Sequence, residues 1–236
     1  MQPIKIYNGP HGQGPNPWKP IIIAEELGLP EIKSEPYTSL NPNGRLPAMI
    51  DPNKNVTLWE SGAIINYLVA TYDKNLKLTY GDDRLEEKWQ LQSWLMFQMS
   101  GQDPMFGQKT DTGTRPKRIT GVVNDSLRKQ RQKRGLSADE PVWLVGDKCT
   151  YADLSFVSWN TLLGTIFPGG SLDLEKEFPE YFRWHANMIK RPATKKVLEF
   201  REEGIHTMKD TGNQVVERQK DARQLPVYEK SLGVDK

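Results

Sequence analysis

Residues 41–64 read NPNGRLPAMIDPNKNVTLWESGAI and contain two short apolar segments on either side of a polar turn. The apolar segments, residues 46–50 and 56–58, have the length of β-strands, and the sequence Asp51-Pro52-Asn53 between them is typical of a tight turn. Ser61 then has the position of an N-cap before a segment whose apolar residues recur at the helical period. Those residues are Ile64, Ile65, Leu68 and Tyr72. The stretch therefore predicts a β-hairpin followed by a helix.

The residues before this hairpin predict a strand, a helix and a second strand. Residues 3–7 alternate in polarity, which indicates a strand. Asn16 and Pro17 have the pattern of an N-cap and a first helical residue, and Gly28 is placed to end that helix. Residues 31–34 can form a short strand. The order strand, helix, strand, strand, strand, helix predicts a small α/β layer with a partly antiparallel sheet.

Beyond this layer, apolar residues recur mainly at helical spacing. The predicted helices cover residues 85–99, 118–134, 154–163 and 182–189. A capping-box pattern, Thr150 to Asp153, precedes the third of them. We therefore expect an α/β domain over residues 1–80, an all-helical domain over 83–205, and a polar, loosely ordered tail over 206–236.

The composition excludes several classes of protein. A net charge of +2 over 236 residues is too weak to predict a nucleic-acid or membrane surface. A single cysteine, Cys149, excludes a disulfide framework and a thiolate zinc site, and three scattered histidines (His11, His185 and His206) leave little for a metal. No apolar run approaches the ~20 residues of a membrane helix, and the N-terminus lacks a signal-peptide pattern. We expect a soluble, cytoplasmic protein without a bound metal.

The start of the helix after the hairpin is the first candidate binding site. A helix N-terminus offers unpaired N–H groups and a partial positive charge, so a carboxylate could bind at Ser61. Glu60 could hold an ammonium group beside that carboxylate, and the two residues would then recognise an α-amino acid group. The alternative, which this segment alone favours, is an ordinary N-cap preceded by an exposed glutamate.

Two further candidates precede it in the chain. Asn16 could donate its side-chain amide to a thiolate, which together with the helix terminus could lower a thiol pKa by about one to two units. Pro47, if its peptide bond is cis, would turn the backbone of Leu46 outward to pair with an extended peptide. The local alternatives are that Asn16 only caps its helix and that Pro47 is an ordinary turn proline.

In their order and spacing these motifs resemble the glutathione S-transferase family. Residues 41–48 (NPNGRLPA) and 58–64 (LWESGAI) are similar to its thioredoxin-like domain, and residues 14–19 (GPNPWK) are similar to a fungal branch related to the yeast nitrogen-regulatory prion protein. The helical half agrees with the same family. The agreeing segments are residues 94–101, 104–108, 143–156, 177–181 and 191–192.

The resemblance implies a thioredoxin-like α/β domain followed by an all-α domain, and it implies roles for five residues in glutathione binding. Pro47 would be a cis-proline, and the backbone of Leu46 would pair with the cysteinyl part of glutathione. Glu60 and Ser61 would hold the γ-glutamyl group, and Arg45 would flank the peptide.

The resemblance also implies that Asn16 is the catalytic residue beside the sulfur. Tyr7 ranks below it, because it is expected inside the first strand, and Asp153 would have a structural role as a helix cap. Residues 30–41 and 108–141 are shorter than the family pattern. The first of these segments normally supplies a contact to the glycyl carboxylate of glutathione, and the second normally helps to form the electrophile pocket and the dimer contact.

The leading hypothesis is therefore a homodimeric glutathione S-transferase that joins the glutathione thiolate to an electrophilic small molecule. Fungal secondary-metabolite biosynthesis and detoxification are the roles that the resemblance implies. Two alternatives stay open: a glutathione-dependent disulfide or peroxide reductase, and a non-catalytic regulator or ligand carrier. The basic run at residues 128–134 is interpreted as a solvated helix face rather than a nucleic-acid patch.

Overall fold

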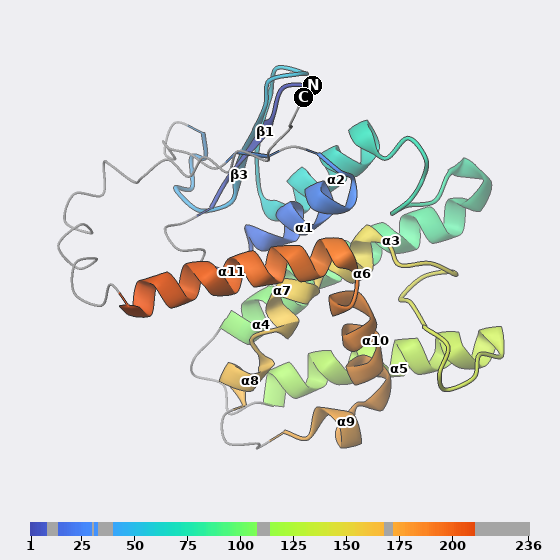
Figure 1. Ribbon diagram of the computed structural model, residues 1–236. Coiled ribbons are helices and arrows are strands. Elements are labelled where there is room, and N and C mark those ends of the chain that lie inside the picture. The colour runs from blue at the N-terminus through green and yellow to red at the C-terminus, as the bar shows by residue number, and fades with distance from the viewer. Residues whose placement is uncertain (9–13, 30, 33–39, 108–113, 168–171, 211–236) are drawn as a thin grey trace. The chain divides into compact units, whose positions relative to one another are not determined.

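The computed structural model describes residues 1–8, 14–29, 31–32, 40–107, 114–167 and 172–210 (Figure 1). Contacts divide this part of the chain into two compact units. The first holds residues 1–68 and the described residues after 192, and the second holds residues 69–192. A small sheet in the first unit and many helices in the second confirm the predicted combination of an α/β and an all-α part. The domain boundaries near residues 80 and 205 stay predictions.

The sheet of the first unit has four strands in the order β2-β1-β3-β4. Their bounds are β1 Ile4–Tyr7, β2 Glu31–Ile32, β3 Ala48–Asp51 and β4 Val56–Trp59. β2 is parallel to β1, and β3 is antiparallel to both β1 and β4. The predicted hairpin is confirmed as β3 and β4, and the parallel β1–β2 pair requires the helix that connects them.

Helix α1 (Trp18–Glu26) connects β1 to β2 and carries much of the core of the first unit. It begins at Trp18, so Pro17 occupies the N-cap position instead of the predicted first helical position. It ends at Glu26, and Gly28, just beyond the C-cap Leu27, terminates it as predicted with a φ of +67° that suits glycine. The N–H of Gly28 bonds to the carbonyl of Glu25 and that of Leu29 to Ala24, at 3.0 and 2.9 Å, which closes the helix C-terminus.

Two other helices contribute to this unit. Helix α2 (Ser61–Tyr72) follows the hairpin as predicted, and it buries Ile64, Ile65 and Leu68. Helix α11 (Pro192–Asp210) packs on α1 through Trp18 and Phe200, whose ring centroids lie 6.1 Å apart. It extends over residues 206–210, the first part of the predicted tail, and residues 211–236 lie outside the described residues.

In the described residues of the second unit, all the regular secondary structure is helical. Its elements are η2 Asp82–Arg84, α3 Leu85–Phe97, η3 Gln98–Gln102, α4 Asp103–Gly107, α5 Thr114–Arg134, α6 Tyr151–Ser155, α7 Val157–Asn160, α8 Leu163–Ile166, α9 Leu174–Glu177 and α10 Pro179–Ile189. The helices predicted at residues 118–134 and 182–189 are present as α5 and α10. The helix predicted at 85–99 is α3, which widens into the π-helix η3, and the one predicted at 154–163 is divided into α6, α7 and α8.

The capping box of α6 is confirmed, and it makes Asp153 a structural residue at the centre of the second unit. Its fully buried carboxylate accepts four hydrogen bonds of 2.7–2.9 Å. The donors are the N–H of Leu144, the N–H and hydroxyl of Thr150, and the indole of Trp184. Burial raises the pKa of Asp153, while these donors act in the opposite direction.

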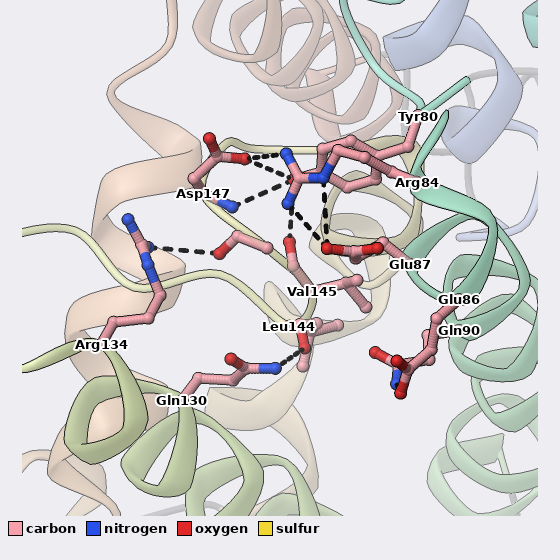
Figure 2. Close-up of polar contacts among 11 residues, drawn as sticks. Tyr80, Arg84, Glu86, Glu87, Gln90, Gln130, Arg134, Leu144, Val145 and Asp147 are labelled. Carbon is pink, nitrogen blue, oxygen red and sulfur yellow. Dashed lines mark hydrogen bonds and ion pairs between the residues drawn. The ribbon is translucent and has the colours of Figure 1, made fainter. Parts of the chain in front are cut away.

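The loop that supplies the Leu144 N–H is held in place by polar contacts, which Figure 2 shows. Asp147 forms an ion pair with Arg84 at 2.7 Å and accepts from the hydroxyl of Tyr80 at 3.1 Å. From helix α5, Gln130 donates to the carbonyl of Leu144 at 3.3 Å. These contacts lie within the second unit and support its capping box.

Candidate functional site

The strand register brings three strand ends into one row across the sheet of the first unit. Ala48 is paired with Tyr7 on one side and with Trp59 on the other. Because neighbouring strands are about 4.8 Å apart, this row spans about 10 Å. The residues that follow β1, precede β3 and follow β4 therefore lie at the same end of the sheet. All the glutathione-binding candidates, Arg45 included, are in, or next to, these connections.

The connection before β3 contains the cis peptide bond predicted at Pro47. Leu46 precedes this bond and lies outside the strand, and its backbone groups bond to no backbone group of another described residue. Arg45 is exposed just before it. The geometry thus agrees with a backbone edge at Leu46 that an extended ligand could pair with, as the sequence predicts.

The connection after β4 places Glu60 and Ser61 at the N-terminus of α2. The carbonyl of Glu60 accepts from the N–H of Ile64 at 3.0 Å, so Glu60 is the N-cap residue instead of the predicted Ser61, which is the first residue of the helix. Glu60 is exposed and has a φ of +68°, whereas an N-cap usually has extended backbone. Ser61 is buried. A positive helix end therefore lies beside a side-chain carboxylate, the arrangement predicted for an α-amino acid group.

Asn16 lies in the turn that leads into α1 and is partly buried. Its carbonyl accepts from the N–H of Lys19 at 3.3 Å. Since α1 follows β1 and returns to the parallel strand β2, its N-terminus lies at the same end of the sheet as the carboxyl end of β1. Tyr7 is buried within β1, where the sequence places it.

The turn before Leu46 contains a residue that the sequence reading missed. Asn41 is buried among exposed neighbours and forms hydrogen bonds along the loop that ends at Arg45. Its signal in the sequence is the Asn-Pro-Asn-Gly pattern, which is typical of a turn in which the first side chain bonds to the backbone.

Other segments singled out in the sequence lie away from this end of the sheet or outside the described residues. Most of the shortened segment at residues 30–41 and part of that at 108–141 are not described. The basic run at 128–134 forms the end of α5, where Arg131 forms an ion pair with Glu180 at 3.0 Å and Arg128 with Asp125 at 3.1 Å. The exposed side chains of the run fit the interpretation of a solvated helix face, whereas Arg131 does not, because its side chain is only 11% exposed.

The described residues contain no cluster of three or more His, Cys, Asp or Glu side chains that could hold a metal ion. No helix in the described ranges is long and apolar enough to cross a membrane.

Comparison with known proteins adds an independent observation. Residues 21–70 match the family model "Glutathione S-transferase, N-terminal domain", and residues 110–201 match "Glutathione S-transferase, C-terminal domain". The chain is 40% identical over 222 residues to the glutathione S-transferase-like protein OpS6 of Beauveria bassiana, covering 84% of this chain and 95% of the relative.

Solved structures agree with these matches. Ure2p5 from Phanerochaete chrysosporium, cocrystallised with 1-(S-glutathionyl)-2,4-dinitrobenzene, has a TM-score of 0.76 and 33% identity, and the match covers 88% of this chain and 98% of that chain. The nitrogen regulation fragment of the yeast prion protein Ure2p has a TM-score of 0.72 and 34% identity, with 84% and 98% covered.

Proposed function

The chain belongs to the glutathione S-transferase family, and from this membership we propose that it binds glutathione and joins its sulfur to an electrophilic small molecule. The observation that carries the proposal is the row Tyr7–Ala48–Trp59, which brings the connections of three strands to one end of the sheet. Similarity to a structure that contains a glutathione conjugate supports the same proposal.

In this proposal the end of the sheet recognises glutathione along its length. The N-terminus of α2 at Ser61 binds the γ-glutamyl carboxylate, and Glu60 binds the adjacent ammonium group. The backbone of Leu46, before cis-Pro47, pairs with the cysteinyl residue, and Arg45 flanks the peptide. Each contact uses a charged side chain, a helix N-terminus or backbone groups, which match the charged and peptide groups of this tripeptide.

The proposed chemistry starts from the thiolate. The thiol of glutathione loses its proton to solvent, the sulfur forms a bond to an electrophilic carbon, and the displaced electron pair goes to a leaving group or into a conjugated acceptor. The side-chain amide of Asn16 stabilises the thiolate, and one pKa unit of that stabilisation corresponds to about 1.4 kcal/mol. The protein contributes thiolate stabilisation and positioning.

Calorimetric titration of the purified chain with glutathione tests the binding step. Conjugation of chlorodinitrobenzene, disulfide exchange and peroxide reduction are then assayed separately. We expect Asn16→Ala to lower turnover and shift the pH profile of conjugation to higher pH, while glutathione binding changes little. If millimolar glutathione gives no heat signal and leaves the melting temperature unchanged, the proposed function is wrong.

A second candidate function is favoured by the similarity to the nitrogen regulation fragment of Ure2p. In that case the chain would bind glutathione or another ligand without catalysis and act as a regulator or carrier. Binding of glutathione with no activity in any of the three assays would favour this candidate. Activity in disulfide exchange or peroxide reduction, without conjugation, would favour a reductase.

We also propose that the protein is a cytoplasmic homodimer, for which secondary-metabolite biosynthesis or detoxification is the proposed setting. The proposed biological role rests on the resemblance to the family. An exposed apolar stripe on helix α3 supports the dimer. It consists of Leu85, Trp89 and Met96, which are 55%, 62% and 49% exposed.

A further inference from the structure

The loop before the cis peptide bond is built around a single buried side chain. Asn41 is 2% exposed, whereas residues 42–45 are all exposed. A polar residue buried under an exposed loop gains little from hydrophobic burial, so its hydrogen bonds account for its position.

Asn41 forms three hydrogen bonds, each to a different part of this loop. Its side-chain oxygen accepts from the N–H of Asn43 at 2.9 Å, and its carbonyl accepts from the N–H of Gly44 at 2.8 Å. Its side-chain amide donates to the carbonyl of Arg45 at 2.5 Å. The first two bonds define the turn. Gly44, at the end of this turn, has a φ of +61°. The third bond acts on the residue before Leu46.

The bond to Arg45 fixes the direction of the next N–H. The peptide between Arg45 and Leu46 is planar and trans, so its carbonyl and its N–H point in opposite directions. Because the Arg45 carbonyl points to the Asn41 amide, the Leu46 N–H points away from Asn41. That N–H bonds to no backbone group of another described residue, so it is available as a donor at the ligand edge.

We propose that Asn41 is a positioning residue for glutathione: its amide holds the Arg45–Leu46 peptide so that the Leu46 N–H faces the cysteinyl backbone of the ligand. This inference rests on the proposed function, which assigns Leu46 to that contact. Asn41 itself does not touch glutathione. Its effect is on the orientation of the donor, and therefore on glutathione binding rather than on the chemical step.

Two variants separate this role from a role in the turn. Asn41→Ala removes both side-chain hydrogen bonds. Asn41→Asp keeps the acceptor for Asn43 but loses the donor to Arg45, so it preserves the turn and releases the peptide plane. We expect each variant to raise the Kd of glutathione and its KM about tenfold, with kcat at saturating glutathione changed less than about twofold.

Asn53→Ala is the matched control, because Asn53 lies in the β3–β4 turn at the other end of the sheet. It bonds to the N–H and carbonyl of Gln2, both at 2.8 Å, and we expect its loss to lower the melting temperature without changing the Kd. If Asn41→Asp binds glutathione like the wild type, the inference is wrong. If Asn41→Ala does not fold, the Kd of glutathione for Asn41→Asp alone tests the inference. Failure of the wild type itself to bind would overturn the proposed function and the inference together.

Discussion

At the scale of single residues, the backbone of Glu60 is the most informative feature of the site. A φ of +68° in a residue with a side chain costs about 1 kcal/mol relative to glycine. Glu60 is exposed, so packing does not explain why this position has a long charged side chain. A glutamate held in a strained conformation at the N-terminus of α2 is consistent with the proposed role in binding the ammonium group of glutathione.

This conformation makes two substitutions at position 60 behave differently. Glu60→Gly relieves the strain and is expected to leave the melting temperature unchanged or slightly higher, while Glu60→Gln keeps the strain. Both lose the carboxylate, and we expect both to raise the Kd of glutathione about tenfold or more, because an ammonium–carboxylate bond contributes about 1.5–3 kcal/mol. Calorimetric titration and thermal unfolding provide the two measurements. A Kd unchanged in Glu60→Gln would support the simple N-cap interpretation.

The sequence could predict those site residues whose roles follow from residue type and position. Pro47 and Ser61 are of this kind, since a cis bond needs proline and a helix N-terminus has a recognisable pattern. Asn41 could not be predicted in the same way. Its role depends on which carbonyl its amide reaches, and this is known only when the path of the loop is known.

At the scale of elements, the junction between α6 and α10 is held by one carboxylate, which accepts four hydrogen bonds. The carboxylate of Asp153 joins the loop before α6, the N-terminus of α6 and Trp184 on α10. Removing it leaves buried donors on all three without a partner, and each such donor costs about 1–3 kcal/mol.

We therefore expect Asp153→Ala to lower the free energy of unfolding by about 3–5 kcal/mol, measured by denaturant titration. The control is Asp173→Ala at the N-cap of α9. Asp173 is exposed and accepts one bond, from the N–H of Lys176 at 3.1 Å, so its loss is expected to cost about 1 kcal/mol. Equal effects of the two substitutions would contradict the structural role assigned to Asp153.

The helix predicted at residues 154–163 shows that apolar periodicity alone does not predict where a helix is interrupted. The hydroxyl of Ser155 donates to the carbonyl of Ala152 at 2.7 Å, and that of Thr161 donates to Ser158 at 2.8 Å. Such side-chain bonds to the backbone compete with the helical pattern, and here they accompany the breaks between α6, α7 and α8. The apolar spacing of the segment is helical, but it contains no information about these local bonds.

At the scale of the whole chain, the pH dependence of stability has an identifiable source in the second unit. The side-chain oxygen of Asn160 accepts from Gln102 at 2.7 Å and from the hydroxyl of Tyr181 at 2.5 Å. The amide of Asn160 is thus left to donate to Nδ1 of His185, which lies 3.4 Å away. This arrangement requires neutral His185, and burial lowers the pKa of His185 from 6.5 to about 4.

Because the pKa of His185 is lower in the folded than in the unfolded state, its neutral form stabilises the fold. This contribution is complete above pH 6.5 and is lost as the pH falls from 6.5 to about 4, with an upper limit of about 3 kcal/mol. Denaturant titrations between pH 7.5 and 4.5 should show that the wild type loses more stability than His185→Gln over this interval. Parallel pH profiles for the two proteins would show that His185 is not the source.

The order of secondary-structure elements could be predicted from the sequence, but the arrangement of the sheet depends on more than that order. The hairpin of β3 and β4 follows from a short turn. The central place of β1, between β2 and β3, requires contacts between residues more than 40 positions apart, such as Tyr7 with Ala48. A single sequence does not specify such pairs, and it is this pairing that brings the candidate site together.

Three of the exposed large apolar residues of the described chain lie on helix α3, and this bears on the proposed dimer. Leu85, Trp89 and Met96 are four and seven positions apart, so they share one face of the helix. A stable dimer buries about 1,200–2,000 Å² in total, and an exposed tryptophan at such a surface contributes strongly to affinity. A second copy of the chain is the partner that the family resemblance implies.

We expect the wild type to sediment as a dimer at micromolar concentration and Trp89→Glu to raise the dimer dissociation constant at least about tenfold. Val122→Glu is the control, because Val122 on α5 is also a partly exposed apolar residue but lies outside the stripe. Both substitutions are at exposed positions, so neither should change the free energy of unfolding of a monomer by more than about 0.5 kcal/mol. A wild type that sediments as a monomer at every concentration, or equal dissociation of the two variants, would exclude the α3 stripe as the dimer contact.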